Sequence, residues 1–409
     1  MSSPASPAPA PVPATGRIDT LDALRGFALG GILLINLTAF ANPGGPPGFG
    51  ADGPWTDRAV FAALILLVES KFFCLFSLLF GVGFSLQLRA EGGFLRRFSR
   101  RLLVLSGFGA AHILLLWEGD ILLLYATVGF ILLLFRRTSS QGLLMWAGGL
   151  LAVPLAVYTL LFAGTLLTRL VPETAAELQR LDAEVTELFR HGREQAMERP
   201  RPADFGELVT EHAAGYAETG VLLASRIPTV LAMFLLGLYT GKRGVLTDPD
   251  DRLLKRVRRW GLGVGLTLSG LVTLAAFTLP AVSGLAALFF NQAVAGPVLA
   301  AGYAAEFLLL ARRGGWWLAP LAAVGRMALT NYLTQSLACS VLFARWGFRL
   351  GPLVPPPAQL AVAAGIFAAQ VGVSVLWLRR FRFGPLEWLW RTLTYGKVQP
   401  LRRGRADGE

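Results

Sequence analysis

Polar side chains are rare inside the long apolar stretches of this 409-residue chain, and they are the groups that could do chemistry. An ionisable group at mid-bilayer depth costs roughly 2.5–3.5 kcal/mol on insertion scales, so its presence there indicates a functional site by default. His112 carries an imidazole that suits a general base, and the carboxylates Glu118 and Asp120 follow it closely enough to orient it. The other polar groups of this kind are Arg25, Asn36, Lys71, Asn291, Gln292, Glu306, Arg326, Asn331, Gln335 and Gln370.

Three of these groups are expected at one depth in the membrane. Counting about 1.5 Å of helical rise per residue places Asn36, His112 and Asn331 about 16–20 Å from the cytoplasmic face. We therefore expect their side chains to share one polar pocket in the outer half of the membrane. Arg25 and Arg326 lie nearer the cytoplasm by the same count, where guanidinium groups suit a phosphate ligand.

Each of these residues also has a structural interpretation. A histidine inside a span is equally typical of a hydrogen bond between helices, so His112 has both readings. Arg25 follows Asp22 and could form an ion pair at the start of its helix. Glu118 and Asp120 lie in a short external turn, where both could be solvated. Four glycines in the apolar stretches favour close helix packing over ligand binding, namely Gly81, Gly83, Gly107 and Gly109.

Helices that cross a membrane have to position these groups. The chain is 54% hydrophobic and 16% charged, whereas a soluble domain of this length would expose far more charge. A hydrocarbon core of about 30 Å needs roughly 20 helical residues. We predict an all-α fold, a polytopic transmembrane helix bundle of about ten spans. The predicted spans are residues 24–41, 72–88, 102–117, 121–135, 143–167, 221–241, 260–279, 285–310, 318–343 and 360–378.

Basic residues fall on alternate sides of successive predicted spans, which is the positive-inside pattern of cytoplasmic loops. With ten spans, this pattern places both termini in the cytoplasm. The formal net charge of +12 therefore reflects topology and not nucleic-acid binding. Residues 56–70 are apolar but charged at both ends, which predicts an interfacial helix before the second span. The basic segments are residues 89–101, 136–137, 242–259, 312–313 and 379–405.

The chain divides into a membrane domain, residues 17–394, and two terminal tails. Residues 1–16 are rich in Pro, Ala and Ser, which predicts a disordered tail, and residues 395–409 form a basic cytoplasmic tail. Within the membrane domain, residues 172–220 form an external loop with eleven acidic residues against five arginines. Its apolar spacing predicts two amphipathic helices, which either cover the outer mouth of the bundle or form a solvated excursion without a role.

Several classes of function are excluded by what the sequence does not contain. It has no GxxxxGK[ST], no GxGxxG after a strand and no HExxH, so an ATP-driven pump and a soluble nucleotide site are disfavoured. Cys74 and Cys339 both lie in apolar stretches and predict small buried side chains, with neither a disulfide nor a zinc framework. We expect no metal site and no tightly bound cofactor.

Several stretches of the sequence together resemble the YeiB-like family of bacterial inner-membrane proteins, known as domain of unknown function 418. The resemblance runs from about Arg17 to Thr394 in the family's order, and it implies a multi-pass protein of the bacterial cytoplasmic membrane. The stretches are residues 17–26 (RIDTLDALRG), 35–36 (IN), 72–83 (FFCLFSLLFGVG), 111–112 (AH), 119–122 (GDIL), 325–332 (GRMALTNY), 335–336 (QS) and 384–391 (GPLEWLWR).

The family's opening helix is similar to the first helix of transmembrane acyltransferases such as heparan-alpha-glucosaminide N-acetyltransferase. Those enzymes move an acyl group from cytoplasmic acyl-CoA to an acceptor across the membrane, and the spacing from an Arg-Gly pair to an Asn is shared here as Arg25 to Asn36. The heparan enzyme has its catalytic histidine in the loop after that Asn, whereas the next histidine in this chain is His112. Under this resemblance acyl-CoA is a co-substrate, and the acceptor is a small molecule, glycan or lipid.

The leading hypothesis is therefore a membrane acyltransferase. In it His112 is the general base, Glu118 or Asp120 orients it, and Asn36 helps to position the reacting groups. The groups expected to bind substrate or the CoA phosphates are Arg25, Arg326, Asn331, Gln335 and Asp22.

Two other functions fit the same residues. A secondary transporter or exporter of a small solute would line its path with these polar groups, although the sequence shows no clear inverted repeat or paired broken helices. A non-catalytic membrane component could instead dock a partner through residues 172–220. In each case the lipid bilayer is the first partner, nucleic acid is not one, and a homo-oligomer is compatible with the sequence.

Overall fold

A computed structural model describes residues 19–43, 54–89, 93–245 and 250–403, so the predicted tail of residues 1–16 lies outside the described residues. The described chain is helical, and its β pairing is confined to an isolated bridge between Phe381 and Arg402. Helices pair the backbone N–H and C=O groups of their interior within the segment, which a chain surrounded by lipid requires. The predicted all-α, polytopic helix bundle is confirmed.

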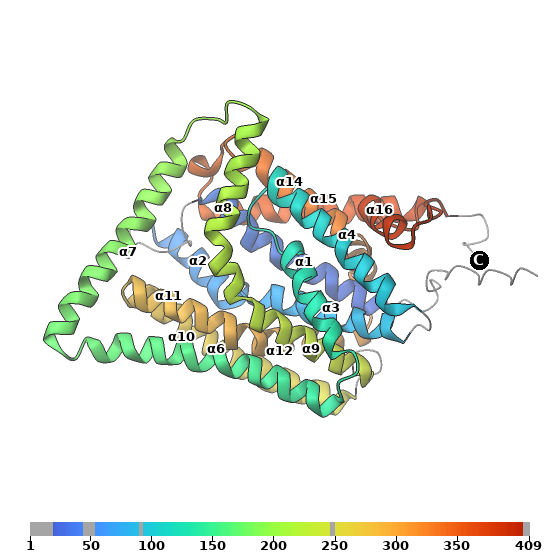
Figure 1. Ribbon diagram of the computed structural model, residues 1–409, viewed down its shortest axis with the longest axis horizontal. Coiled ribbons are helices and arrows are strands. Elements are labelled where there is room, and N and C mark those ends of the chain that lie inside the picture. The colour runs from blue at the N-terminus through green and yellow to red at the C-terminus, as the bar shows by residue number, and fades with distance from the viewer. Residues whose placement is uncertain (1–18, 44–53, 90–92, 246–249, 404–409) are drawn as a thin grey trace, which may run out of the picture.

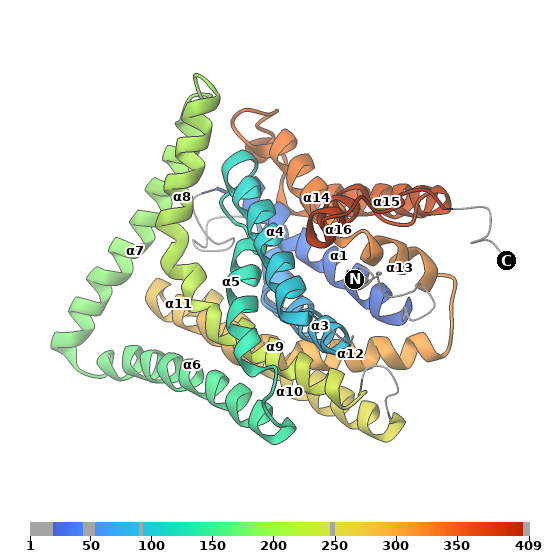
Figure 2. The same ribbon diagram turned by 45° about the vertical axis from the view of Figure 1, so that its right-hand side comes forward.

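Many of the helices, among them α6, α10, α12 and α15, run near the horizontal in Figure 1, whereas α7 and α8 run steeply across that direction. Turning the molecule by 45° separates α4 and α5 from the helices behind them (Figure 2). The helices are α1 Asp19–Ala41, α2 Trp55–Leu67, α3 Lys71–Leu88, α4 Phe94–Leu115, α5 Leu122–Leu132, α6 Ser140–Thr168, α7 Pro172–Glu198, α8 Phe205–Ser225, α9 Ile227–Lys242, α10 Asp251–Thr278, α11 Ala281–Phe290, α12 Gly296–Arg312, α13 Leu318–Arg326, α14 Ala328–Phe343, α15 Pro356–Arg380 and α16 Pro385–Tyr395.

Eight helical segments of the described chain are long and apolar enough to cross a membrane. A shorter apolar helix, Leu122–Phe135, corresponds to a further predicted span. The predicted span 318–343 is wrong as a single helix, because α13 and α14 meet at Met327, where the backbone leaves helical geometry. The predicted count of ten is thus reached only when the short helix and this broken pair are included.

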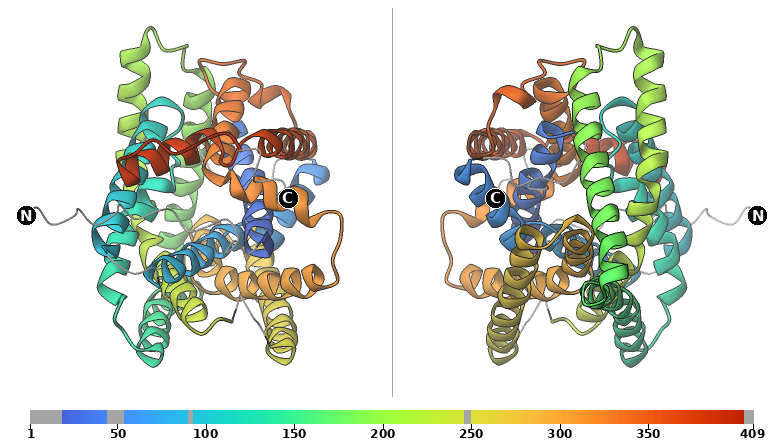
Figure 3. Two further views of the ribbon diagram at one scale, coloured as in Figure 1. Left: turned by 90° about the vertical axis from the view of Figure 1, so that its right-hand side faces the viewer. Right: turned by 90° about the vertical axis from the view of Figure 1, so that its left-hand side faces the viewer.

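The two predicted amphipathic helices of the external loop are α7 and α8. Following the predicted topology, the end of the bundle where they lie is called the outer end, and α7 runs across it (Figures 1 and 3). Asp182 of α7 accepts hydrogen bonds from the Val282 backbone N–H and from Arg169, both at 3.0 Å. This carboxylate therefore attaches α7 to the start of α11.

Glycines allow the closest helix contacts in the bundle. A Cβ atom at Gly81 would lie 2.1 Å from the Phe234 carbonyl oxygen of α9, and one at Gly109 would lie 2.5 Å from the Leu123 backbone nitrogen. The packing interpretation is confirmed for these two. It is wrong for Gly107, where a Cβ atom would meet nothing within 4 Å, and for Gly83, where it would meet one Arg25 nitrogen at 3.8 Å.

Two further interruptions lie inside the apolar segments. Between α2 and α3, Ser70 has a φ of 68°, in the left-handed region that non-glycine residues rarely adopt. Between α11 and α12, the residues Asn291–Ala295 form a π-helix, a feature that often accompanies functional sites. The sequence showed no clear paired broken helices, whereas the structure contains these interruptions.

Candidate functional site

The outer end of α4 places a histidine and a carboxylate in direct contact. His112 Nδ1 lies 2.9 Å from Asp120 Oδ1, and each residue is 1% exposed. Asp120 follows α4 in a short turn, and its other oxygen accepts a hydrogen bond from the Leu123 backbone N–H at 2.6 Å. Because that bond caps the first turn of α5, the carboxylate is held in place beside the imidazole by local structure.

The second ring nitrogen of the pair, His112 Nε2, has no partner among the described residues. The Tyr332 ring lies 5.3 Å away between centroids, and the Ile121 backbone lies within hydrogen-bonding range of its buried hydroxyl. Since buried polar atoms are almost always satisfied, the unsatisfied ring nitrogen indicates a position for a ligand group or a water molecule.

Helix α8 covers the outer side of the pair. His212 Nδ1 is 3.1 Å from the Leu114 carbonyl oxygen, and Glu118 packs beside Gly215. Burial raises the pKa of Tyr216, and the negative charge of Asp120 contributes to the shift. Of the two carboxylates proposed from sequence to orient His112, Asp120 is the one that contacts it, whereas Glu118 contacts α8.

The structure does not join the three groups that were expected to share a pocket. Asn331 Nδ2 donates to the Val324 carbonyl oxygen at 3.1 Å and to Ser374 Oγ at 3.0 Å. Gln335 Nε2 donates to Gln370 Oε1 at 2.8 Å, so both residues bind α14 to its neighbour α15. Within the described residues no hydrogen bond links Asn331 or the half-buried Asn36 to His112.

Tyr332 occupies the place beside His112 that Asn331 was expected to fill. Successive residues of a helix point about 100° apart, so when Asn331 faces α15 its neighbour faces α4. The sequence reasoning missed Tyr332 because a tyrosine in an apolar helix looks like a packing residue. The available signal was its position directly after Asn331.

Arg25 and Arg326 lie next to a close contact between α1 and α13. A Cβ atom at Gly26 would lie 2.1 Å from the Leu321 carbonyl oxygen and 3.3 Å from the Gly325 nitrogen, so α1 and α13 touch at this pair of glycines. The two arginines are the direct neighbours of these glycines and lie level with each other. Arg25 is ion-paired with Asp22.

Comparison with known proteins places this arrangement in a family. The family model described as "Protein of unknown function (DUF418)" matches residues 240–397. YxaH of Bacillus subtilis is 34% identical across 95% of this chain and 96% of its own length, and YeiB of Escherichia coli is 31% identical across 93% and 97%. This chain belongs to the DUF418 family. No solved structure matches it.

A carboxylate in the DUF418 stretch 384–391 explains how the broken pair α13 and α14 is held. Glu387 of α16 accepts hydrogen bonds from the backbone N–H groups of Leu329 and Thr330, at 2.6 and 3.0 Å, and from the Thr330 hydroxyl at 2.6 Å. These are the orphan donors of the first turn of α14. Helix α16 therefore caps a helix nearly sixty residues away in sequence.

The DUF418 fold holds a second buried polar group outside the His112 pair. Lys71 Nζ donates to the Ile65 carbonyl oxygen at 2.6 Å and to Asn291 Oδ1 at 3.0 Å, and Asn291 Nδ2 donates to Glu69. Lys71 and Asn291 are both fully buried. This network joins the α2–α3 turn to the π-helix, so the two backbone irregularities stabilise each other.

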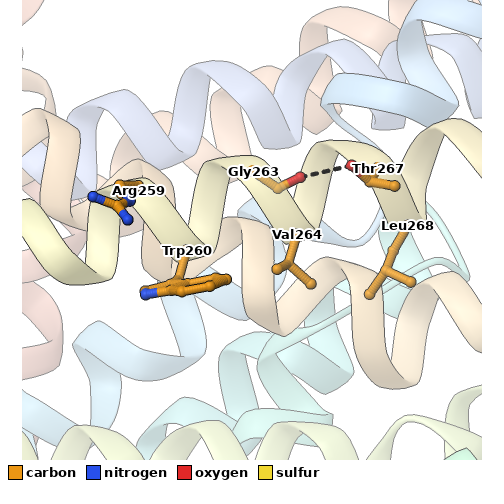
Figure 4. Close-up of a pocket in the computed structure, with 6 residues that line it drawn as sticks. All are labelled: Arg259, Trp260, Gly263, Val264, Thr267 and Leu268. Atoms are coloured by element: carbon orange, nitrogen blue, oxygen red, sulfur yellow. Dashed lines mark hydrogen bonds between the residues drawn. The ribbon is translucent and has the colours of Figure 1, made fainter.

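A surface hollow of about 290 Å³ lies away from the His112 pair in this DUF418 structure. It runs along the exposed face of α10, beside Trp260, Val264 and Leu268 (Figure 4). None of the site residues predicted from sequence lines it. Its apolar lining is what a face turned to lipid requires, so we do not assign it to the chemistry.

Proposed function

We propose that this multi-pass membrane protein is an acyltransferase of the bacterial cytoplasmic membrane, moving an acyl group from cytoplasmic acyl-CoA to an acceptor at the outer side. One observation carries the proposal. It is the buried pair of His112 and Asp120, in which the second ring nitrogen, Nε2, has no hydrogen-bond partner among the described residues and the imidazole lies against the Tyr332 ring. Acyl transfer uses a histidine that a carboxylate orients and whose other ring nitrogen is free to accept a proton.

The chemistry assigns a role to each group. The acceptor's hydroxyl or amine attacks the thioester carbonyl carbon while His112 Nε2 takes its proton. Asp120 is a positioning residue that keeps Nδ1 protonated and stabilises the imidazolium. The C–S bond then breaks, and the departing sulfur takes the proton from Nε2. In this mechanism the Tyr332 hydroxyl donates a hydrogen bond to the oxyanion of the intermediate.

The remaining predicted groups keep supporting roles in this proposal. Arg25 and Arg326 hold the CoA phosphates at the inner end. Asn36 is half-buried on α1 and has no hydrogen bond among the described residues, so its amide is open to a substrate group. Asn331 and Gln335 act indirectly, by fixing α14 against α15.

The test compares His112→Gln with the parent and with His212→Gln. Membranes from cells that overproduce each variant receive acetyl-CoA labelled in the acetyl group, and label transferred to membrane or periplasmic material is counted. Gln has similar bulk but cannot accept a proton near neutral pH, so His112→Gln should transfer label on the order of 10²–10⁴-fold more slowly. His212 lies in α8 and only contacts a backbone carbonyl, so its variant should keep the parental rate.

Equal transfer by all three proteins, or no transfer above membranes that lack the protein, would reject the acyltransferase.

A secondary transporter is the second candidate, because the structure supplies the discontinuous helices that the sequence did not reveal. The π-helix at Asn291–Ala295 and the break at Met327 both lie in apolar segments and carry buried polar groups. Transporters bind substrates at such interruptions. If the protein is a transporter, Lys71→Met should stop solute movement and leave acetyl transfer unchanged. If it is an acyltransferase, His112→Gln should instead slow acetyl transfer.

A further inference from the structure

The exposed face of α10 carries a cluster of basic side chains near the start of the helix. Lys255, Arg256 and Arg259 are all exposed, and they line a second surface hollow of about 500 Å³. Arg259 and Trp260 border this basic hollow and also the apolar hollow beside Val264. The two hollows therefore adjoin at Arg259 and Trp260, and together they follow one helix from a charged end to an apolar end.

The basic side chains of this cluster have no anionic partner in the part of the chain that the structure describes. The nearby carboxylates of Asp251 and Glu306 are ion-paired with other arginines. No described carboxylate oxygen lies within 4 Å of Lys255, Arg256 or Arg259. Three positive charges at the rim of a hollow therefore remain available to an anion from outside the chain.

The second hollow continues from this charge along the apolar half of α10. Trp260, Val264 and Leu268 follow one another at intervals of four residues and project to the same side of the helix (Figure 4). Thr267 also lines the hollow, but its hydroxyl donates to the Gly263 carbonyl oxygen at 2.9 Å, so its polar hydrogen is already bonded within the helix. Beyond the tryptophan the lining therefore suits a hydrocarbon chain.

Gly263 leaves the space in this apolar hollow. A Cβ atom at Gly261 would lie 2.7 Å from the Gly302 Cα atom, and one at Gly265 would lie 2.9 Å from the Leu299 Cα atom, so these two glycines allow α10 to pack on α12. A Cβ atom at Gly263 would meet nothing within 4 Å. Gly263 therefore has no packing role within the described chain, and its missing side chain leaves room for a group from outside.

We propose that this face of α10 binds an anionic phospholipid, with the phosphate at Lys255, Arg256 and Arg259 and an acyl chain along Trp260 to Leu268. Charge complementarity identifies the occupant. Guanidinium groups bind phosphate oxygens through paired hydrogen bonds, and basic pockets at the cytoplasmic ends of transmembrane helices attract anionic headgroups. An exposed tryptophan between the two parts suits the boundary between headgroups and hydrocarbon. The site does not depend on the proposed acyltransferase.

The length of the site matches one leaflet of a bilayer. Leu268 lies nine residues after Arg259, which corresponds to about 14 Å along the helix. This is about half of a hydrocarbon core of roughly 30 Å. The predicted topology places the start of α10 in the cytoplasm, so the lipid belongs to the inner leaflet. A soluble phosphate compound would occupy only the basic hollow, whereas a phospholipid occupies both.

The experiment measures the binding of single lipids to the purified protein in detergent by native mass spectrometry. Phosphatidylglycerol is compared with phosphatidylcholine, which carries the same acyl chains and no net charge. We expect the parent to bind phosphatidylglycerol roughly tenfold or more tightly. Arg256→Gln and Arg259→Gln should each weaken phosphatidylglycerol binding roughly fivefold, the usual contribution of one basic residue beside an anionic headgroup, and should leave phosphatidylcholine binding unchanged.

Filling the apolar hollow tests the acyl chain separately from the headgroup. The side chain of Gly263→Leu occupies the hollow, so this variant should weaken the binding of both lipids by a similar factor. Gly365→Leu is the matched control, because Gly365 is an exposed glycine of α15 whose added Cβ atom would also meet nothing within 4 Å. Arg96→Gln removes an exposed arginine from α4 and controls for diffuse surface charge. Both control variants should bind each lipid like the parent.

Three results would overturn the site. They are equal binding of the two lipids by the parent, a loss with Arg96→Gln as large as with Arg259→Gln, and unchanged lipid binding by Gly263→Leu. Glycerophosphoglycerol, which is the headgroup without acyl chains, should not compete at the same concentration as the lipid. Equal competition would make a soluble phosphate compound the ligand and reject the phospholipid.

Discussion

His112 and Tyr332 differ in how far the sequence could reveal them. An imidazole in an apolar helix is conspicuous because its burial is costly, and a carboxylate eight residues later suggested the partner that the structure provides. Tyrosine is amphipathic and common in apolar helices, so its role depends on which neighbours it meets. Those neighbours come from α4, more than two hundred residues earlier in the chain.

Tyr332→Phe tests whether that hydroxyl serves substrate or structure. The variant keeps the ring contact with His112 and removes a buried hydroxyl that lies beside the Ile121 backbone. We expect thermal stability to change little, because a neutral hydrogen bond contributes only about 0.5–1.5 kcal/mol. Acetyl transfer should fall by on the order of 10²-fold, as when an oxyanion donor is lost. A sharp drop in melting temperature would mean that the hydroxyl has a structural partner instead.

At the scale of helices, hydropathy predicted most segments because lipid demands long apolar helices. It could not predict the break at Met327, since residues 325–328 contain no proline and the first turn of α14 is capped by Glu387 from α16. A cap that comes from a distant helix leaves no local signal. No local sequence pattern predicts the π-helix at Asn291–Ala295 either, because it depends on contact with the α2–α3 turn.

The capping role of Glu387 can be measured by its removal. Glu387→Ala leaves the donors of Leu329 and Thr330 without acceptors, and we expect a loss of about 2 kcal/mol of unfolding free energy or more. Glu387→Gln keeps one carbonyl acceptor and should lose less. Melting of the purified variants in detergent measures both, and equal melting of the Ala and Gln variants would argue against capping.

The same carboxyl group should make stability depend on pH. Burial raises the pKa of Glu387, while hydrogen bonds from Thr330 and Leu329 oppose the shift. The folded protein then holds this proton more tightly than the unfolded chain, so its contribution is present below the ordinary pKa of about 4.5 and is lost as pH rises through the raised value. The difference in melting temperature between the parent and Glu387→Gln should shift against the parent over that range. A difference that stays constant with pH would show that the shift is absent.

A matched pair of glycine-to-alanine substitutions tests the packing between helices. Gly81→Ala would place a Cβ atom 2.1 Å from the Phe234 carbonyl oxygen and force α3 and α9 apart. We expect a loss of about 1–3 kcal/mol or more, as for other overpacked cores. Gly107→Ala meets nothing within 4 Å and should be neutral or stabilising by about 0.5–1 kcal/mol, because alanine favours helix. Similar melting temperatures for the two variants would contradict the packing.

At the scale of the whole molecule, the proposed function needs two chemically different ends. In the proposal Arg25 of α1 and Arg326 of α13 lie at the inner end, and the His112 pair lies at the outer end, where His212 of α8 contacts the Leu114 carbonyl oxygen of α4. Helix α4 joins these ends and passes the core of the bundle. The charge pattern of the loops is the part of this arrangement that the sequence predicts best, because orientation depends on loop charge and not on packing.

Orientation is therefore the property that decides whether acyl-CoA in the cytoplasm could reach Arg25 and Arg326 at the inner end. Single cysteines at Gln141, Ala183 and Trp316 lie at exposed positions, while the native Cys74 and Cys339 are buried and should give little background. With intact cells and an impermeant maleimide, Ala183→Cys should label, since α7 lies at the outer end. Gln141→Cys and Trp316→Cys should label only after the cells are permeabilised. Labelling of Gln141→Cys in intact cells would invert the bundle, placing the arginines outside the cytoplasm and away from any acyl-CoA.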